Sequence, residues 1–256
     1  MDHPLNEYLD FAVQTAFEAG RLTLGYFQAG VQPEFKQDET PVTVADREAE
    51  THIRQCIESR YPDHSITGEE FGEGEAPADA PRWYIDPIDG TKAFMRGVPL
   101  YSVLLGLEIS GSIEVGVAYF PGLDESVYAA RGEGAYWNGR RCQVTKTQTL
   151  DESIISCTNP AAFSQYGKEA AWNRLIKRAY HVSGWSDAYG HALVATGRIE
   201  VMADPIMEPY DAGPFPVILH EAGGYFGDWS GNETIHGNEG ISTTKHLLPE
   251  VLEVLA

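Results

Sequence analysis

The sequence predicts a layered α+β fold with mixed sheets. Apolar residues recur at helical spacing near the start of the chain, whereas turn-separated, β-like segments dominate its middle. Helices and strands follow one another in blocks and not in strict βαβ alternation, which favours α+β layers. With 256 residues, 43% of them hydrophobic, the chain has enough apolar material for one layered domain over residues 1–256.

Two amphipathic helices are expected first. Apolar side chains at helical spacing run over residues 7–27, and a second set runs from Ala45 to Ile57 and ends near Tyr61. The polar segment 28–41 between them contains two prolines, so we expect a loop there.

The next block is predicted to be mostly strands. A short strand over Ser65–Thr67 leads into the acidic run Gly68-Glu69-Glu70, and a loop follows over 71–82. A strand over Arg82–Ile85 is then expected to stop at Asp86-Pro87. Three further strands are separated by Ser-Gly and Pro-Gly turns: Tyr101–Glu108, Ile113–Tyr119 and Ser126–Ala130.

The second half of the chain alternates short helices and strands after tight turns at 132–135 and 138–139. Its expected elements are a strand over Leu150–Cys157, a helix over 168–180, a helix over Asp187–Thr196 with Gly197 as C′ cap, a strand over Ile199–Ala203, a helix over 212–222 and a closing helix over Val251–Leu255.

Composition excludes several classes of partner. The chain carries 38 acidic residues against 18 basic ones, a formal net charge of −20, so we expect no nucleic-acid and no membrane partner. No apolar run is long enough to span a membrane, and the start lacks the features of a secretory signal. The three cysteines have no CxxC spacing and no evident His partner, which indicates reduced packing thiols in a cytoplasmic protein.

The run Asp86-Pro87-Ile88-Asp89-Gly90-Thr91 raises the main question of function. Asp-Pro and Asp-Gly are ordinary turn residues, and the pair can be no more than that. However, two nearby carboxylates repel unless a cation lies between them, and backbone N–H groups at the Gly90-Thr91 turn are suited to an anion. Together these groups indicate a divalent cation beside a phosphate.

Three more acidic residues lie at element boundaries, and each has a simpler alternative. Glu69 can belong to an exposed acidic loop, Asp46 can close a capping box with Thr43, and Asp211 can be the N-cap of the following helix. If they converge with Asp86 and Asp89, the all-oxygen set is typical of Mg²⁺, with Mn²⁺ or Ca²⁺ as alternatives.

The motifs G-E-E, D-P-I-D-G-T, D-A-G and E-A-G-G, spread from Thr40 to Gly224, resemble the inositol monophosphatase-like family of Mg²⁺-dependent phosphatases. The resemblance implies an αβαβα sandwich, usually a homodimer, with two or three Mg²⁺ ions for which Mn²⁺ can substitute. We expect the metal and phosphate groups in about residues 1–145 and the substrate side in about 146–256.

The resemblance also implies roles for individual residues. Metal ligands would be Glu69, Asp86, the Ile88 carbonyl, Asp89 and Asp211. Glu69 and Thr91 would position and activate the attacking water, with Asp46 supporting Thr91. Phosphate would be held at Asp89, Gly90 and Thr91, and Lys36 would lie near the site. In-line attack by metal-activated water on a small phosphomonoester follows, with no phosphoenzyme.

One departure from the family pattern bears on the substrate. Where many members have Trp before the metal-binding Asp, this chain has Tyr210, within E-P-Y-D-A-G-P-F-P. This variant, with G-W-S-D-A-Y-G-H before it and G-D-W-S-G after it, looks most like the histidinol-phosphate phosphatase branch. Asp187 and Asp204 would then pair with the ammonium and imidazole of the leaving group, although an N-cap and a turn residue remain the respective alternatives.

Rival activities remain open. Inositol-1-phosphate or a broad range of small phosphomonoesters would suit the same motifs, whereas nucleotide and sugar bisphosphates would need a basic cluster that the sequence lacks. An inactive regulatory metal-binding module is the remote alternative, and the completeness of the acidic set argues against it.

Overall fold

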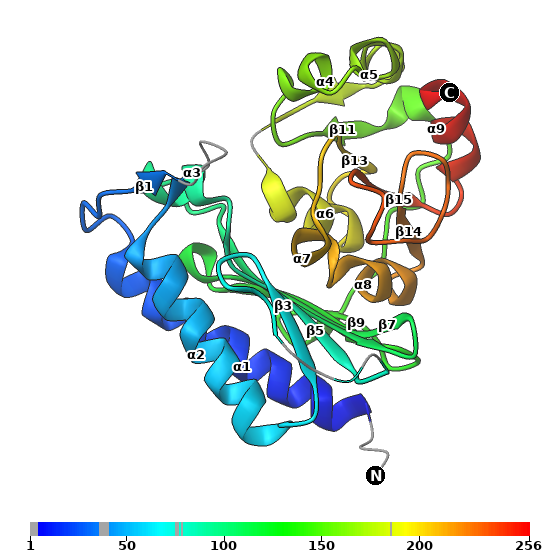
Figure 1. Cartoon of the computed structure of the whole chain (residues 1–256). Helices are drawn as coiled ribbons and strands as arrows, with labels where there is room; N and C mark the ends of the chain where they lie inside the picture. Colours follow the sequence, from blue (N-terminus) through cyan, green and yellow to red (C-terminus); the bar gives the residue numbers. More distant parts are fainter. Residues whose placement is uncertain (1–4, 36–40, 75–76, 78, 185) are drawn as a thin grey trace.

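The computed structural model describes residues 5–35, 41–74, 77, 79–184 and 186–256. In this part of the chain, helices and two large sheets stack as helix, sheet, helix, sheet, helix (Figure 1). Helices α1 (Leu5–Tyr26) and α2 (Val44–Arg60) form the first layer. The other helices are α3 (Thr91–Met95), α4 (Ala162–Gln165), α5 (Glu169–Ile176), α6 (Asp187–Ala195), α7 (Pro209–Ala212), α8 (Phe215–Glu221) and α9 (Leu248–Leu255). The predicted α+β fold with mixed sheets is confirmed.

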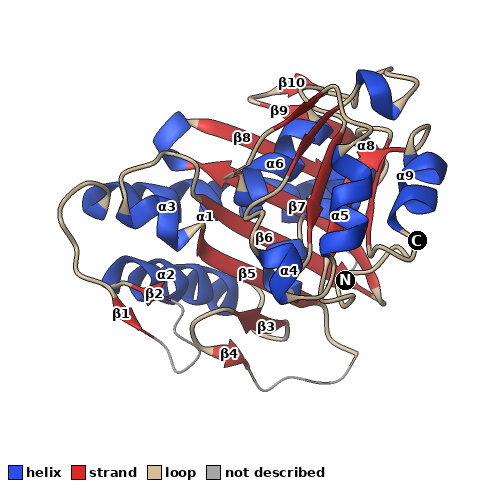
Figure 2. Ribbon diagram, turned by 90° about the horizontal axis from the view of Figure 1, so that it is seen from above, coloured by secondary structure: helices blue, strands red, loops and turns tan. Residues whose placement is uncertain are grey.

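The larger sheet has the strand order β10-β9-β8-β7-β6-β5-β3-β4, which Figure 2 shows from above. Strands β3 and β5 are parallel and the other neighbours are antiparallel. Its strands are β3 (Ser65–Gly68), β4 (Gly72–Glu73), β5 (Arg82–Asp89), β6 (Ser102–Ile109), β7 (Ser112–Phe120), β8 (Glu125–Ala130), β9 (Gly134–Trp137) and β10 (Arg140–Arg141).

The smaller sheet has the order β12-β11-β13-β15-β14. Strand β11 runs parallel to both of its neighbours, whereas β13, β15 and β14 pair antiparallel, so this sheet is mixed as well. Its strands are β11 (Ile154–Ser156), β12 (His181–Val182), β13 (Val201–Asp204), β14 (Gly224–Gly227) and β15 (Gly240–Thr244).

Apolar side chains fill the space between the layers. Leu105 on β6 packs with α1 and α2, whereas Leu104, one residue earlier, points to the opposite face and joins the cluster around α6 and α8. A third cluster, which includes Trp172 and Val251, lies between the smaller sheet and α5 and α9. Each fully buried side chain of this size contributes about 1.5–3 kcal/mol of transfer free energy.

The segment that joins α7 to α8 lies directly on the larger sheet, because glycines at the contact leave no side chain between the two backbones. A Cβ atom added to Gly106 on β6 would lie 2.5 Å from the backbone of Gly213, between the two helices. This close approach holds the end of α7, near Asp211, against β5 and β6.

Several predicted elements need correction. The expected loop 28–41 contains a short hairpin of β1 (Glu34–Phe35) and β2 (Pro41–Val42), and β4 lies in the expected loop 71–82. The expected strand 150–157 shrinks to β11 after a 3₁₀ turn over Leu150–Glu152. The single helix 212–222 is instead two, α7 and α8. Lys36 lies outside the described residues.

In the part of the chain that the structure describes, no helix combines the length and the apolar character needed to cross a membrane.

Candidate metal and substrate site

A bulge in β5 brings Asp86 and Asp89 to one face of the larger sheet. The strand was expected to stop at Asp86, but it continues to Asp89. Asp86 pairs with Leu104 and Asp89 with Ser102, so three steps along β5 match two along β6. Because side chains alternate between faces, a separation of three would place the two carboxylates on opposite faces of a regular strand. The extra residue of the bulge restores them to the same face.

Asp211 joins this pair from α7. Carboxylate oxygens of Asp86, Asp89 and Asp211 all lie within 4.8 Å of one another. The alternative that Asp211 is an N-cap is not what the structure shows, because Glu208 has that position. Asp211 is the third helical residue and closes a capping box, with the Glu208 N–H donating to its Oδ2 at 3.0 Å.

Each of these three carboxylates accepts a backbone N–H on one oxygen. The Ile88 N–H donates to Asp86 Oδ1 at 2.9 Å, and the Ala188 N–H donates to Asp89 Oδ2 at 2.9 Å. Ser102 Oγ also donates to Asp89 Oδ2, at 3.1 Å. These bonds hold the three side chains in place.

The electrostatics of the cluster fit a cation. Burial raises the pKa of Asp86, Asp89 and Asp211 well above the usual range, and repulsion from neighbouring carboxylates raises it further. A hard divalent cation would relieve this repulsion, and the donor set of oxygens alone suits Mg²⁺.

Glu69 belongs to the same electrostatic group. It follows β3, which is the parallel neighbour of β5, and its N–H donates to Ile85 O at 3.2 Å. Its negative charge contributes to the raised pKa values of Asp86, Asp89 and Asp211. The sequence-predicted acids of the metal site therefore converge in the fold.

Thr91 and Asp46 meet as the family resemblance implies. Thr91 Oγ1 lies 3.5 Å from Asp46 Oδ1 and 3.2 Å from the Ile88 carbonyl oxygen. Asp46 also closes the capping box expected with Thr43, whose N–H donates to Asp46 Oδ2 at 2.8 Å. Burial raises the pKa of Asp46 to about 6, with the Thr43 hydrogen bonds opposing that shift.

Gly90 makes the turn from β5 into α3. Its φ of +83° lies in the left-handed region that glycine adopts without strain. The turn begins α3 at Thr91, and the first N–H groups of a helix have no partner within it. The amides predicted to hold phosphate are thus placed next to Asp89.

A cavity of 340 Å³ lies beside the acidic cluster. Asp89, Asp211, Asp187 and Asp204 all line it, so the structure brings the two predicted substrate-side acids next to the acidic cluster. Asp187 is not the cap of α6, because Ser186 holds the N-cap position and Asp89 accepts the Ala188 N–H. Burial, and then the charge of Asp204, raise the pKa of Asp187 to about 7, whereas Lys92 lowers it.

Asp204 is engaged within the fold. Its two carboxylate oxygens accept the N–H and the hydroxyl of Thr158, at 2.9 and 3.1 Å. His191, fully buried as expected of a core histidine, places Nε2 3.4 Å from Asp204 and Nδ1 2.7 Å from Ser242 Oγ. Because Asp204 already has these partners, Asp187 is the more available of the two carboxylates for binding substrate.

Sequence reasoning missed part of the cavity lining. Lys92 directly follows Thr91, so its position next to the D-P-I-D-G-T motif could have predicted that it lines the cavity. Thr158 and Asn159 follow the end of β11, where side chains of different strands meet. Gln165 and Tyr166 come from the end of α4, and no pattern in the sequence marks them.

Comparisons with known proteins identify the family of the chain. Residues 5–255 match the model of the inositol monophosphatase family. A histidinol-phosphatase of Chlorobaculum parvum is 42% identical over 94% of this chain and 93% of its own length. A histidinol-phosphatase of Mycobacterium tuberculosis is 32% identical, covering 95% and 96%.

Relatives with other names match too. The Nus factor SuhB of Escherichia coli K12 is 31% identical over 92% of this chain and 90% of its own length. The solved structure of an IMPase from Thermotoga maritima superposes with a TM-score of 0.87 at 31% identity, over 97% of this chain and 96% of that one.

Proposed function

The chain belongs to the inositol monophosphatase family, and from this we propose that it is a Mg²⁺-dependent phosphomonoesterase that hydrolyses L-histidinol phosphate to L-histidinol and phosphate. The observation that supports this most is the cavity in which the Asp86–Asp89–Asp211 cluster adjoins further carboxylates on the substrate side. The 42% identity to a histidinol-phosphatase supports the same substrate.

Residues on three elements would hold the metal. Asp86 and Asp89 come from β5, Asp211 from α7, and Glu69 from the turn after β3, with the Ile88 carbonyl as a main-chain ligand. Mg²⁺ bound there supplies positive charge that stabilises the phosphoryl transition state and lowers the pKa of the attacking water.

Thr91, Asp46 and Glu69 would orient that water. With its proton directed to Asp46 Oδ1, the Thr91 hydroxyl presents a lone pair that accepts a hydrogen bond from the water. Asp46 is itself held by Thr43, so the orientation of the hydroxyl is fixed before substrate arrives. Glu69 would be the carboxylate that takes the proton.

The phosphate would bind at the turn from β5 into α3, through the amides of Gly90 and Thr91 and the cations held at Asp89. This arrangement directs the ester oxygen and the leaving group towards the cavity lined by Asp187.

Asp187 would bind the ammonium of histidinol. Its carboxylate lies in the cavity and is not used for capping α6, whereas that of Asp204 is engaged with Thr158. A cationic partner would restore the ionised form of Asp187, whose pKa burial raises. A neutral polyol would leave this charge uncompensated.

Inositol-1-phosphate, or a broad range of small phosphomonoesters, is the alternative, supported by the likeness to the Thermotoga maritima IMPase. A homodimer also remains a proposal, which sedimentation of the purified protein would test.

The activity is tested by measuring inorganic phosphate released from a panel of phosphomonoesters. We expect hydrolysis that depends on Mg²⁺, for which Mn²⁺ can substitute, and that stops in EDTA. Full turnover in EDTA, or none of any ester at saturating Mg²⁺, would overturn the proposal.

A further inference from the structure

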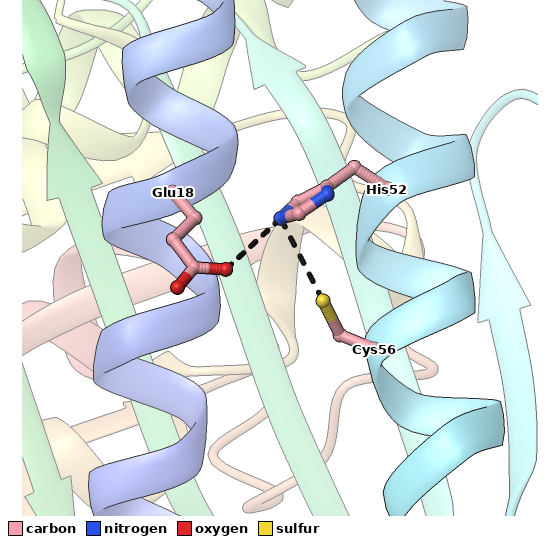
Figure 3. Close-up of side chains that lie close together, drawn as sticks. All are labelled: Glu18, His52 and Cys56. Carbon is pink, nitrogen blue, oxygen red and sulfur yellow. Dashed lines mark hydrogen bonds and ion pairs between the residues drawn. The ribbon is translucent and has the colours of Figure 1, made fainter.

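Three side chains of different chemistry meet on the outer helices, apart from the acidic cluster. Glu18 extends from α1, and His52 and Cys56 extend from α2, all pointing towards one another (Figure 3). His52 Nε2 lies 3.2 Å from Glu18 Oε2 and 3.6 Å from Cys56 Sγ. The expectation that no histidine partners a cysteine was therefore wrong for Cys56.

The helix period explains this convergence. His52 and Cys56 are four residues apart and so lie one above the other on the same face of α2. Ile53 and Ile57, each one residue later, are fully buried under the helix. The His52–Cys56 face consequently lies at the edge of the core, beside α1, in a groove that is also lined by Phe11, Gln14, Thr15, Gln55 and Ser59.

The distances match the edges of a tetrahedral zinc site. Bond lengths of about 2.05 Å to nitrogen, about 2.1 Å to oxygen and about 2.3 Å to sulfur put N and O about 3.4 Å apart and N and S about 3.5 Å apart. The corresponding separations here are 3.2 and 3.6 Å. A carboxylate oxygen of Glu18 and Cys56 Sγ are within 4.8 Å, and the Glu18 side chain, 42% exposed, has room to close on the metal.

We propose that Glu18, His52 and Cys56 form a Zn²⁺ site that joins α1 to α2, with water as the fourth ligand. Thiolate and imidazole select Zn²⁺ or similar transition metals over Mg²⁺, so this site and the all-oxygen cluster differ in the ion that they take. They share no ligand. The proposal is independent of the phosphatase activity.

A catalytic Cys–His pair is the other use of such residues, and the surroundings argue against it. Burial and the charge of Glu18 raise the pKa of the Cys56 thiol, whereas a nucleophilic cysteine needs a lowered one. Coordination to Zn²⁺ removes the thiol proton and does not depend on a reactive free thiolate.

The site is tested by titrating Co²⁺ into protein that has been freed of transition metals and is kept at saturating Mg²⁺. Co²⁺ takes the place of Zn²⁺, and a thiolate ligand gives a charge-transfer band in the near ultraviolet that oxygen ligands do not give. We expect the band to saturate at about one Co²⁺ per chain and to disappear when Zn²⁺ is added. Cys56→Ser should abolish it, and His52→Gln should weaken binding at least about tenfold.

Two matched controls locate the band. Cys142, which is also partly exposed, directly follows β10 of the larger sheet, so Cys142→Ser should keep the band. Asp211→Asn should keep it as well, because it changes only the acidic cluster. No band in the wild-type protein at about tenfold excess Co²⁺, or a band that survives Cys56→Ser, would overturn the proposal.

Thermal unfolding gives a second readout, since Zn²⁺ bound only to the folded state must stabilise it. We expect Zn²⁺ to raise the Tm of the wild-type protein at saturating Mg²⁺ and to leave that of Cys56→Ser unchanged. Metal-free melting of the variant verifies that it folds. Equal Zn²⁺ effects on both proteins would contradict the proposed site.

Discussion

Asp89 and Ala188 are 99 residues apart in the sequence, yet the Ala188 N–H donates a 2.9 Å hydrogen bond to Asp89 Oδ2. One carboxylate on the larger sheet thus belongs to the acidic cluster and also caps the start of α6. The bond joins the acidic cluster to Asp187, the residue before Ala188. It explains why the cluster and the substrate-side acid occupy fixed relative positions.

Replacing Asp89 separates these two roles. Asp89→Asn keeps an oxygen that accepts the Ala188 N–H but removes the ligand charge, so we expect kcat to fall by about 10³-fold or more. The Tm in EDTA should not fall, because one of three repelling charges is gone. Asp89→Ala loses the cap as well, and should lower the Tm by an amount equivalent to about 1 kcal/mol. Near-wild-type turnover of Asp89→Asn would show that Asp89 is not a ligand.

The Thr91 hydroxyl is predicted to orient the attacking water. Thr91→Val keeps the shape of the side chain and removes the hydroxyl that lies 3.5 Å from Asp46, so kcat should fall by about 10²-fold or more while KM changes little. Thr91→Ser retains the hydroxyl and should retain most of the activity. Equal losses in the two variants would mean that Thr91 acts through packing.

Metal-free stability should fall as pH rises. The folded chain raises the pKa of Asp46 to about 6 and that of Asp187 to about 7 from 3.8, and it raises those of Asp86, Asp89 and Asp211 as well. A group whose pKa is raised by folding contributes stability that is fully present at pH values below its pKa in the unfolded chain. That stability is lost as the pH rises through its pKa in the folded chain. The loss therefore begins near pH 4 and continues beyond pH 7.

Mg²⁺ should oppose this loss, because it binds the ionised carboxylates. We expect the Tm difference between Mg²⁺ and EDTA to be larger at about pH 8 than at about pH 5. Asp211→Asn should reduce both the pH dependence in EDTA and the gain from Mg²⁺. Calorimetric scans that show the same Mg²⁺ effect at both pH values would contradict this electrostatic account.

Asp187 is predicted to select the leaving group. Asp187→Asn suits the position, since Asn also tolerates its φ of +40°, and it removes only the charge. We expect kcat/KM for L-histidinol phosphate to fall about 10- to 100-fold, and that for a neutral phosphate ester to change little. Parallel losses on both substrates would assign Asp187 a structural role.

The amino-acid pattern predicted the helix pair α1–α2, three central strands and the acidic residues that converge, because each depends on local periodicity or on a short motif. The bulge after Asp86 was not predictable in this way. It depends on the pairing of β5 with β6, and Pro87 and Gly90 suggested an early strand end. The resemblance supplied the expected ligands Asp86 and Asp89, but the physical reason why they share a face appears only in the sheet register.

Strands β14 and β15 were missed for another reason. β15 is buried throughout and contains Ser242, Thr243 and Thr244, so it shows no alternation of apolar and polar residues. The His52–Cys56 pair was missed although its spacing of four on a predicted helix was visible. Its third member, Glu18, comes from a different helix, and only the packing of α1 on α2 brings it near.

The central claim is tested most directly by kcat/KM for L-histidinol phosphate and for inositol-1-phosphate, measured as phosphate release at saturating Mg²⁺ in one assay. We predict a large preference for L-histidinol phosphate that Asp187→Asn greatly reduces. A preference for inositol-1-phosphate, or equal kcat/KM values for the two esters, would contradict the proposed substrate. The metal-dependent phosphatase chemistry would still be tested separately, by the Asp89 and Thr91 variants.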